Sequence, residues 1–326
     1  MILAGDVGGT KCNLALFAEK NGKLEFVFRE RFASKEFAKF DLIIREFLRR
    51  AAPYLGQQRI RAAGFGVAGP VIDNRIHATN LPWIVEAETL VQEVGVESIA
   101  LMNDLGATGH SLQHLPPEDF CVLNVGTPVP GASRALLAAG TGLGEGILFW
   151  DGKRYKVVPS EGGHSDFAPR SDQQIELLKF MRHRYPQVSW EEILSGRGFR
   201  TLHDFIAPSV KHPVFEDPDA DPAPFITKSA LDHSCPVCVE TLDLWTSIYG
   251  AEAGNLALKV LALGGVYVAG GIAVKILPKM TDGTFFKSFR DKWHFENMLA
   301  DVPLSVVRNE SAPLIGAAYE AYAGIK

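Results

Sequence analysis

The chain has 326 residues, of which 47% are hydrophobic and 22% charged, and its formal net charge is −5. This composition is typical of a globular protein large enough for two domains, and it gives no electrostatic reason to bind nucleic acid or an anionic membrane. Residues 1–4 lack the pattern of a secretory signal, and the uncharged stretch 260–274 is too short and too rich in glycine to span a membrane. We therefore expect a soluble cytoplasmic protein with no nucleic-acid or membrane partner.

The chain opens with a predicted β-hairpin. Residues 1–4 and 13–17 are expected to form strands joined by a loop, and a third strand is expected at 24–31. Apolar residues at helical spacing then predict a helix over 37–55.

The loop of this hairpin has the residue types of an anion site. Its glycines would expose several backbone N–H groups in one direction, an arrangement that binds phosphate oxygens. Thr10 adds a hydroxyl, and Asp6 could hold a Mg²⁺ ion or its water ligands. The loop sequence is Gly5-Asp6-Val7-Gly8-Gly9-Thr10.

A second glycine-rich run, residues 64–69, matches the GxGxxG pattern of dinucleotide-binding proteins. That fingerprint requires a helix to begin at the glycines, whereas extended residues follow at 70–72. A nicotinamide-binding dehydrogenase is therefore nearly excluded. We expect these glycines to let a strand end approach a ligand closely.

An Asn-Asp pair follows the next apolar strand. A short helix over 86–94 leads into the apolar run 99–102, which ends at Asn103 and Asp104. The carboxyl end of a strand in an open α/β sheet faces the ligand crevice, and a carboxylate there is costly to bury alone. Asp104 is thus either a hydrogen-bonded structural residue or a working acid or base.

The second half repeats the pattern of the first. Strands are expected at 121–125, 135–139 and 147–150, with the glycine-rich loop 140–146 before the last of them. Internal repetition carries more weight than one motif. With Thr141 in the second loop, the two hairpins together predict a clamp for a polyphosphate.

The remaining elements alternate helices and strands. Helices are expected at 172–184, 189–194, 199–206, 229–262 (with a break near Gly250 or Gly254), from 272, and at 313–323; strands at 266–269 and 304–307; and a loop at 212–224. The Gly270-Gly271 turn between a strand and a helix could seat the base and ribose of a nucleotide, or could be a packing turn.

Three further groups of residues could have functional or structural roles. Glu161 and His164 flank two glycines and suit a site that reads hydroxyl groups, although such a histidine is often structural. Glu191 at a helix start is usually a dipole partner. Four cysteines are too few for a disulfide framework, and Cys235-Pro-Val-Cys238 is interpreted mainly as a structural pair at a helix start, with zinc or redox chemistry less favoured.

Taken together and in order, these motifs resemble those of the bacterial glucokinases, sugar kinases of the actin/hexokinase superfamily. The resemblance runs from residue 2 to about residue 316. Besides the first loop it rests on the runs Asn103-Asp104, Gly140-Thr141-Gly142-Leu143-Gly144, Glu161-Gly162-Gly163-His164, Leu194-Ser195-Gly196 and Val268-Ala269-Gly270-Gly271-Ile272. Each is weak alone, but jointly they are highly specific.

The resemblance implies an α/β fold with two actin/hexokinase-like (ribonuclease H-like) domains flanking a deep cleft. The small domain is expected at 1–107, joined by the C-terminal helix at about 310–326, and the large domain at 108–309. The implied activity is ATP-dependent phosphorylation of glucose to glucose 6-phosphate with Mg²⁺. A homodimer is also implied.

The resemblance also implies roles for individual residues. Asp104 is expected to be the base that takes the proton of the sugar 6-hydroxyl. Hydrogen bonds to the sugar are expected from Asn103, Asp104, Glu161, His164, Glu191 and Gly142. Phosphate segments are expected at Gly5 to Thr10 and at Thr141-Gly142, and an adenosine segment at Gly270-Gly271. Asp6 is expected to hold Mg²⁺ through water.

The pattern departs from related families in two places. Lys11 stands where the enterobacterial type usually has Asn, as in the related repressor/kinase family. That family has a cysteine-rich zinc motif soon after its equivalent of His164, whereas Phe167-Ala168-Pro169-Arg170 follows here, so no structural zinc is expected. Its regulators also carry an N-terminal helix-turn-helix, which we do not expect here.

Three alternatives remain open: a kinase for fructose, mannose or an amino sugar, a nucleotide-dependent sugar sensor without turnover, and an actin-like assembly ATPase.

Overall fold

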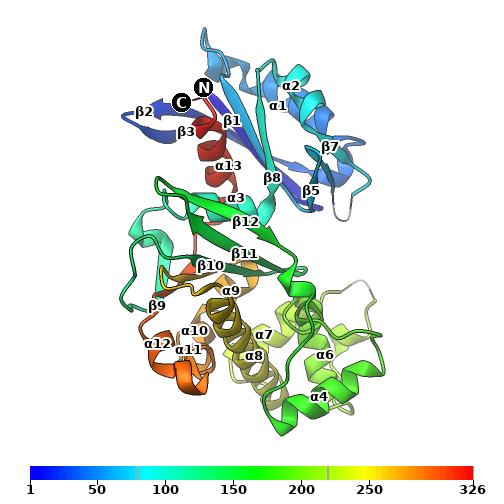
Figure 1. Cartoon of the computed structure of the whole chain (residues 1–326). Coiled ribbons are helices and arrows are strands. Elements are labelled where there is room, and N and C mark those ends of the chain that lie inside the picture. Colours follow the sequence, from blue (N-terminus) through cyan, green and yellow to red (C-terminus); the bar gives the residue numbers. More distant parts are fainter. Residues whose placement is uncertain (79–80, 219, 326) are drawn as a thin grey trace. The chain divides into compact units, whose positions relative to one another are not determined.

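The computed structural model describes residues 1–78, 81–218 and 220–325, so residue 326 of the expected C-terminal segment lies outside it. The chain divides into two compact units (Figure 1). The first comprises residues 1–117, 155–159 and 309–326, and the second comprises residues 118–154 and 160–308. Each is described by itself.

The sheet of the first unit has the strand order β3-β2-β1-β4-β8. β1 pairs antiparallel with β2 and parallel with β4, and β4 pairs parallel with β8. This confirms the N-terminal hairpin and the third strand. The bounds are β1 Ile2–Val7, β2 Lys11–Lys20, β3 Lys23–Ala33, β4 Ala62–Val67 and β8 Ile99–Asn103.

Helices cover both faces of this sheet because its strands are apolar on both sides. Ile2 and Ala4 pack with α13 (Ala312–Ala323), whereas Leu3 between them packs with α1 (Phe40–Leu55) on the opposite face (Figure 1). The alternation follows from the two-residue period of a strand. The predicted helix over 37–55 is confirmed, with its start at Phe40.

The first four residues of the GxGxxG run lie in β4 and Gly69 follows the strand, and no helix begins at these glycines, which confirms that the run is no dinucleotide fingerprint. The expectation of close approach to a ligand is wrong for Gly64 and Gly66. A Cβ on Gly64 would lie 2.2 Å from the carbonyl oxygen of Ala317 in α13, and one on Gly66 would lie 2.8 Å from Cβ of Ala107 in α3 (Asp104–Ser111). These glycines let two helices pack tightly on the sheet.

The other elements of the first unit are smaller. After β4 come a three-stranded antiparallel sheet and a helix, and they occupy β5 Val71–Ile72, β6 Arg75–His77, β7 Ile84–Glu86 and α2 Ala87–Val94. α2 confirms the predicted short helix. The 3₁₀ helix η1 (Ser34–Glu36) follows β3.

The sheet of the second unit carries strands in the order β11-β10-β13-β14-β9. β10 and β11 form an antiparallel hairpin, and β13 runs parallel to β10 and β14. The glycine loop is shorter than predicted, because β11 begins at Leu143. The bounds are β9 Phe120–Asn124, β10 Arg134–Ala139, β11 Leu143–Trp150, β13 Val266–Ala269 and β14 Leu304–Val307; β12 (Tyr155–Ser160) was not predicted.

The long helix predicted over 229–262 is in fact two, and the break lies before Cys235. Gly250 and Gly254 stay helical and allow close packing, since a Cβ on either would lie 2.2 Å from a carbonyl oxygen of α11. The helices are α4 Asp172–Arg182, α5 Trp190–Ile193, α6 Gly196–Ile206, α7 Ala223–Leu231, α8 Pro236–Val260, α9 Gly271–Lys275, α10 Leu277–Met280, α11 Thr284–Arg290 and α12 Glu296–Ala300. Within the described residues, none is both long and apolar enough to cross a membrane.

Candidate functional site

The turn between β1 and β2 is held by a hydrogen bond within the turn and by two from Ser34, and among the described residues these leave the amides of Gly9 and Thr10 unused. The N–H of Gly8 donates to the carbonyl oxygen of Lys11 at 3.0 Å, so it closes the turn. Buried Ser34 donates its hydroxyl to Gly8 O at 2.7 Å and its N–H to Thr10 O at 3.0 Å. Within the described chain, the amides of Gly9 and Thr10 donate no hydrogen bond, so they remain available to an anion.

Asp6 lies at the end of β1 and is held by its register partner on β2. Nδ2 of Asn13 donates to Oδ2 of Asp6 at 2.9 Å, and Nε of Arg31 donates to Oδ1 of Asn13 at 2.9 Å. Burial raises the pKa of Asp6 to about 6, the Asn13 hydrogen bond opposes this, and the nearby Asp104 carboxylate adds to it. Arg31 is thus linked to Asp6 by hydrogen bonds through the neutral side-chain amide of Asn13.

Asp104 is the first residue of α3, a helix that the sequence reasoning missed. Asn103 is its N-cap: Oδ1 accepts from the N–H groups of Leu105 at 2.9 Å and Gly106 at 3.4 Å. Nδ2 of Asn103 donates to Gly69 O at 3.1 Å, which leaves one amide hydrogen for a ligand. The Asn-Asp pair is itself an N-cap signal that could have identified this helix.

The Asp104 carboxyl combines burial with hydrogen bonding at a helix N-terminus. Burial raises its pKa, while the N–H of Leu105, 2.8 Å from Oδ1, favours the charged form and opposes the shift. The helix dipole also favours a negative charge here. In the register of the sheet, Asp6 faces Gly66 of β4, and Val67 beside it faces Asn103 of β8. The first unit therefore brings Asp6, Asn103 and Asp104 to one edge of its sheet.

The second hairpin repeats the turn in different surroundings. The N–H of Gly140 donates to Gly142 O at 2.8 Å, and the amides of Thr141 and Gly142 donate no hydrogen bond within the described chain. Oε2 of Glu191, on α5, accepts from the N–H of Leu143 at 3.0 Å, and Oε1 pairs with Arg197 at 2.9 Å. A Cβ on Gly142 would lie 2.3 Å from Glu191 Oε2, so a larger residue here would displace the Glu191 carboxylate from its present position.

Glu161 is the N-cap of the short 3₁₀ helix η3 (Gly162–His164), and His164 is its last residue. Oε2 of Glu161 lies 4.0 Å from Nε2 of His164, and both side chains are largely exposed. A Cβ on Gly163 would lie 2.0 Å from Leu143 O, and one on Gly162 would lie 2.0 Å from Oε2 of Glu145. The two glycines therefore dock this segment directly onto β11.

Glu145 belongs to a buried acid pair that the sequence reasoning missed. It is 2% exposed and faces Glu252 of α8, which is fully buried. Burial and the neighbouring carboxyl raise the pKa of Glu145, and burial likewise raises the pKa of Glu252, whose carboxylate also contacts Lys259 at 3.3 Å. Near neutral pH the side chain of Glu145 is therefore protonated, and it packs against the backbone of Gly162.

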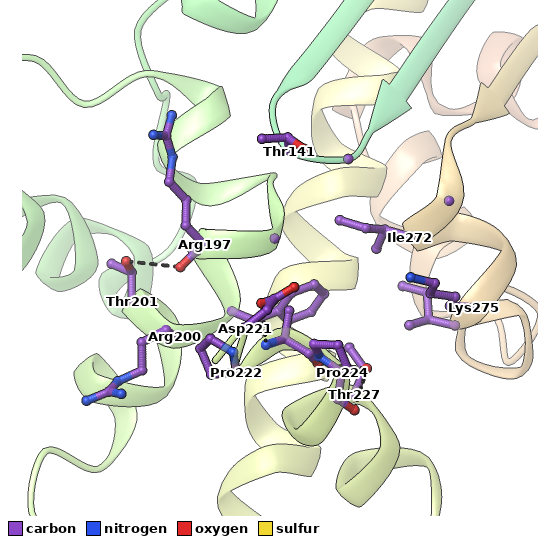
Figure 2. Close-up of a pocket in the computed structure, with 16 residues that line it drawn as sticks. Thr141, Arg197, Arg200, Thr201, Asp221, Pro222, Pro224, Thr227, Ile272 and Lys275 are labelled. Carbon is purple, nitrogen blue, oxygen red and sulfur yellow. Dashed lines mark hydrogen bonds between the residues drawn. The ribbon is translucent and has the colours of Figure 1, made fainter. Parts of the chain in front are cut away.

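A pocket of about 730 Å³ lies in the second unit beside the second hairpin (Figure 2). Thr141 is at its edge, α9 supplies one side with Ile272 and Lys275, and α6 supplies Arg197, Arg200 and Thr201 (Figure 2). Its remaining lining residues are Gly140, Gly196, Phe199, Asp221, Pro222, Ala223, Pro224, Thr227, Gly271 and Ile276. The pocket thus joins the Thr141 turn to Gly271 at the start of α9.

Gly270 itself lies behind the wall of this pocket. Its φ of +89° favours glycine, and a Cβ there would lie 2.5 Å from Ala139 O. The sequence reasoning named Gly270, Gly271 and Thr141 but missed the α6 and 221–227 sides, because nothing in their local pattern indicates a ligand.

Comparisons with known proteins place these features in one family. The Glucokinase family model matches residues 3–323. The glucokinase of Nostoc punctiforme is 37% identical, over 98% of each chain. The glucokinase from an Antarctic psychrotroph is 28% identical with a TM-score of 0.86, covering 99% of this chain and 98% of that one. A ROK family glucokinase from Streptomyces griseus, solved with glucose and AMPPNP, is 21% identical with a TM-score of 0.67 over 99% of each chain. The predicted actin/hexokinase-like α/β fold is confirmed.

Proposed function

The chain belongs to the glucokinase family, and from that membership we propose that Asp104 is the general base of the reaction. The enzyme is a kinase that transfers the phosphoryl group of ATP to glucose. Phosphoryl transfer depends mostly on positioning and charge neutralisation, so the hydroxyl proton is the main covalent task left to a side chain.

The state of the Asp104 carboxyl carries this proposal. Oδ1 is held by the Leu105 N–H at 2.8 Å, which fixes the group and leaves Oδ2 to meet a hydroxyl. A pKa raised by burial makes the carboxylate a better base than a solvated one. The 6-hydroxyl of glucose is the acceptor we assign to it, which makes the product glucose 6-phosphate.

We assign the two hairpins to the phosphates of ATP and the pocket of the second unit to its adenosine. Support comes from the free amides of Gly9, Thr10, Thr141 and Gly142, and from the pocket that joins Thr141 to Gly271. This assignment places Gly5 to Thr10 and Thr141 on phosphates, with Gly270-Gly271 beside the nucleoside.

Mg²⁺ is assigned to Asp6. The carboxyls of Asp6 and Asp104 both have a raised pKa and lie near each other. Arg31 is connected to Asp6 through the neutral side chain of Asn13, so a divalent ion would offset the negative charge. When bound, Mg²⁺ would neutralise charge on the phosphates. Asp6 would hold it through water.

Sugar contacts are assigned to the free amide hydrogen of Asn103, to Glu161 and His164, and to Glu191 with Gly142. The exposed pair 4.0 Å apart on a rigidly docked segment suits hydroxyl recognition. Both carboxylate oxygens of Glu191 already have partners, Leu143 and Arg197. Besides its assigned sugar contact, Glu191 would therefore hold the second hairpin in place. A homodimer stays a prediction from the family resemblance, and a cytoplasmic location stays a prediction from the sequence pattern.

The test is ATP consumption with Mg²⁺, with and without glucose, followed by fructose, mannose and N-acetylated amino sugars. We expect ADP to form only with a sugar, and fastest with glucose. Consumption independent of sugar would favour an assembly ATPase, and glucose binding without turnover would favour a sensor; either result would refute the proposal.

A further inference from the structure

Three metal-binding side chains of the second unit, His203, His212 and Cys238, bring their ligand atoms within 4.8 Å of one another, and Cys235 lies beside His212 and Cys238; none of the four lines the pocket described above. His203 lies in α6, His212 in the segment before α7, and Cys235 and Cys238 at the start of α8. We propose that these four residues bind one structural Zn²⁺ ion. This inference does not depend on the proposed function.

The separations between donor atoms fit a tetrahedral zinc site. Bond lengths of about 2.0–2.1 Å to nitrogen and 2.3 Å to sulfur place ligand nitrogens about 3.3 Å apart and nitrogen and sulfur about 3.6 Å apart. Here the two histidine Nε2 atoms lie 3.2 Å apart, and Nε2 of His212 lies 3.8 Å from Sγ of Cys235 and 4.0 Å from Sγ of Cys238. The ligand atoms of His203, His212 and Cys238 all lie within 4.8 Å of one another.

The hydrogen bonds around the cluster favour a metal over a purely structural pair of cysteines. The N–H of Cys238 donates to Sγ of Cys235 at 3.3 Å, which fixes this sulfur at the N-terminus of α8 beside the histidines. His203 is fully buried, and its Nδ1 has no hydrogen-bond partner among the described residues, so Nε2 is the ring's polar contact. Two facing neutral imidazoles share at most one proton, whereas a metal satisfies both nitrogens.

The composition of the cluster selects the ion. Two thiols and two imidazoles, with no carboxylate in the set, are the donors of structural zinc sites. On binding, each thiol loses its proton to solvent and both histidines bind as neutral imidazoles through Nε2. The rings of Phe215 and Phe225 pack against His212, with centroids 5.0 and 4.7 Å away, and shield the cluster from water.

The ion would fasten the segment that carries His212 to α6 and α8. This segment leads into residues 221–224, which line the pocket. Phe215 is a second connection: its ring centroid lies 4.8 Å from that of His203 and 4.0 Å from the guanidinium carbon of Arg200, a pocket residue. The site would therefore hold one wall of the pocket in place.

Sequence spacing hides this site because neither histidine is near the CxxC in the chain. The experiment uses full-length protein purified with zinc and without chelator. Zinc per chain is measured by mass spectrometry for wild type, Cys235→Ser and His212→Gln. Cys121→Ser and His233→Gln are matched controls, since Cys121 lies in β9 and exposed His233 lies just before the CxxC.

We expect about one zinc per chain in wild type and both controls, and a loss of most of it in the two cluster variants. Cobalt added to zinc-free wild type should give thiolate charge-transfer absorption that both variants lack, and chelator should lower the unfolding temperature of wild type but not of His212→Gln. Far-UV circular dichroism checks that the variants fold. Wild type without bound zinc and without a cobalt spectrum would overturn the proposal, as would a Cys235–Cys238 disulfide in protein purified without reductant.

Discussion

The β1–β2 turn and the β10–β11 turn share one backbone arrangement but differ in charge. In both, the first glycine of the turn closes it through its N–H and the next two amides stay free. Beside the first turn lie Asp6 and Asp104, whose pKa values are raised by burial. Beside the second, Glu191 is already committed to Leu143 and Arg197. The same backbone turn is thus paired once with two buried carboxyls of raised pKa and once with a carboxylate that already holds two partners.

The largest effect is expected from the carboxyl at the first turn. Asp104→Asn keeps the size and the Leu105 hydrogen bond but cannot accept the proton, so kcat should fall by about 10²–10⁴-fold with glucose affinity nearly unchanged. Asp73→Asn, in an exposed turn of the same unit, is the control. Steady-state kinetics and calorimetry separate the two parameters, and a variant with wild-type kcat would remove Asp104 from the mechanism.

At the β10–β11 turn, a larger side chain should weaken ATP binding without any change of charge. Gly142→Ala places a Cβ 2.3 Å from Glu191 Oε2, so the Glu191 carboxylate must shift and the turn loses the hydrogen bond that the Leu143 N–H donates to it. The KM for ATP should rise by about 10-fold. Gly140→Ala is a matched control in the same loop, because its Cβ would meet nothing within 4 Å. Equal KM values for the two variants would show that the Glu191 contact does not position the turn.

Asp6→Asn should separate function from stability. Burial raises the pKa of Asp6 to about 6, so its contribution to stability is present below about pH 4 and is lost as the pH rises to 6. At pH 7 the neutral variant should therefore be more stable by roughly 1–2 kcal/mol, while its activity falls and its Mg²⁺ requirement rises. Urea unfolding and Mg²⁺ titration of the rate test this. A less stable variant with an unchanged Mg²⁺ requirement would contradict it.

The buried pair behind the second turn gives the smallest effect on activity but a clear pH dependence. The pKa of Glu145 is raised to about 8, so the folded state keeps a proton that the unfolded chain loses near pH 4.5. Stability should fall between those pH values by roughly 2–4 kcal/mol in wild type and by less in Glu145→Gln. Exposed Glu240→Gln is the control. Parallel curves for wild type and Glu145→Gln in urea unfolding at pH 5 and pH 8 would refute the assignment.

What the sequence predicted well was local. Both hairpins, the helix before β4 and the last strand and helix follow from turn glycines and apolar periodicity, which act over a few residues. The break between α7 and α8 was misplaced because Gly250 and Gly254 serve packing against α11, a contact that no local pattern shows. The sequence did not predict α3, because Asn103 and Asp104 were interpreted as candidate functional residues and not as the N-cap and first residue of a helix.

The sequence indicated the candidate site residues that lie in turns. It did not indicate residues that become neighbours only when distant segments pack together. Thr10, Asp104 and Thr141 stand out because glycine or a strand end surrounds them. Glu145 with Glu252, and the two histidines with Cys235 and Cys238, become neighbours only through the packing of α6 and α8 on the sheet. Such pairs leave no signal in residue spacing.

The most direct test is a crystal structure of the enzyme with glucose and a nonhydrolysable ATP analogue. The account predicts the glucose 6-hydroxyl within about 2.6–3.2 Å of the Asp104 carboxylate, with phosphate oxygens on the amides of Gly9, Thr10, Thr141 and Gly142. Glucose bound away from Asp104, or phosphates that touch one turn and leave the other in solvent, would contradict it.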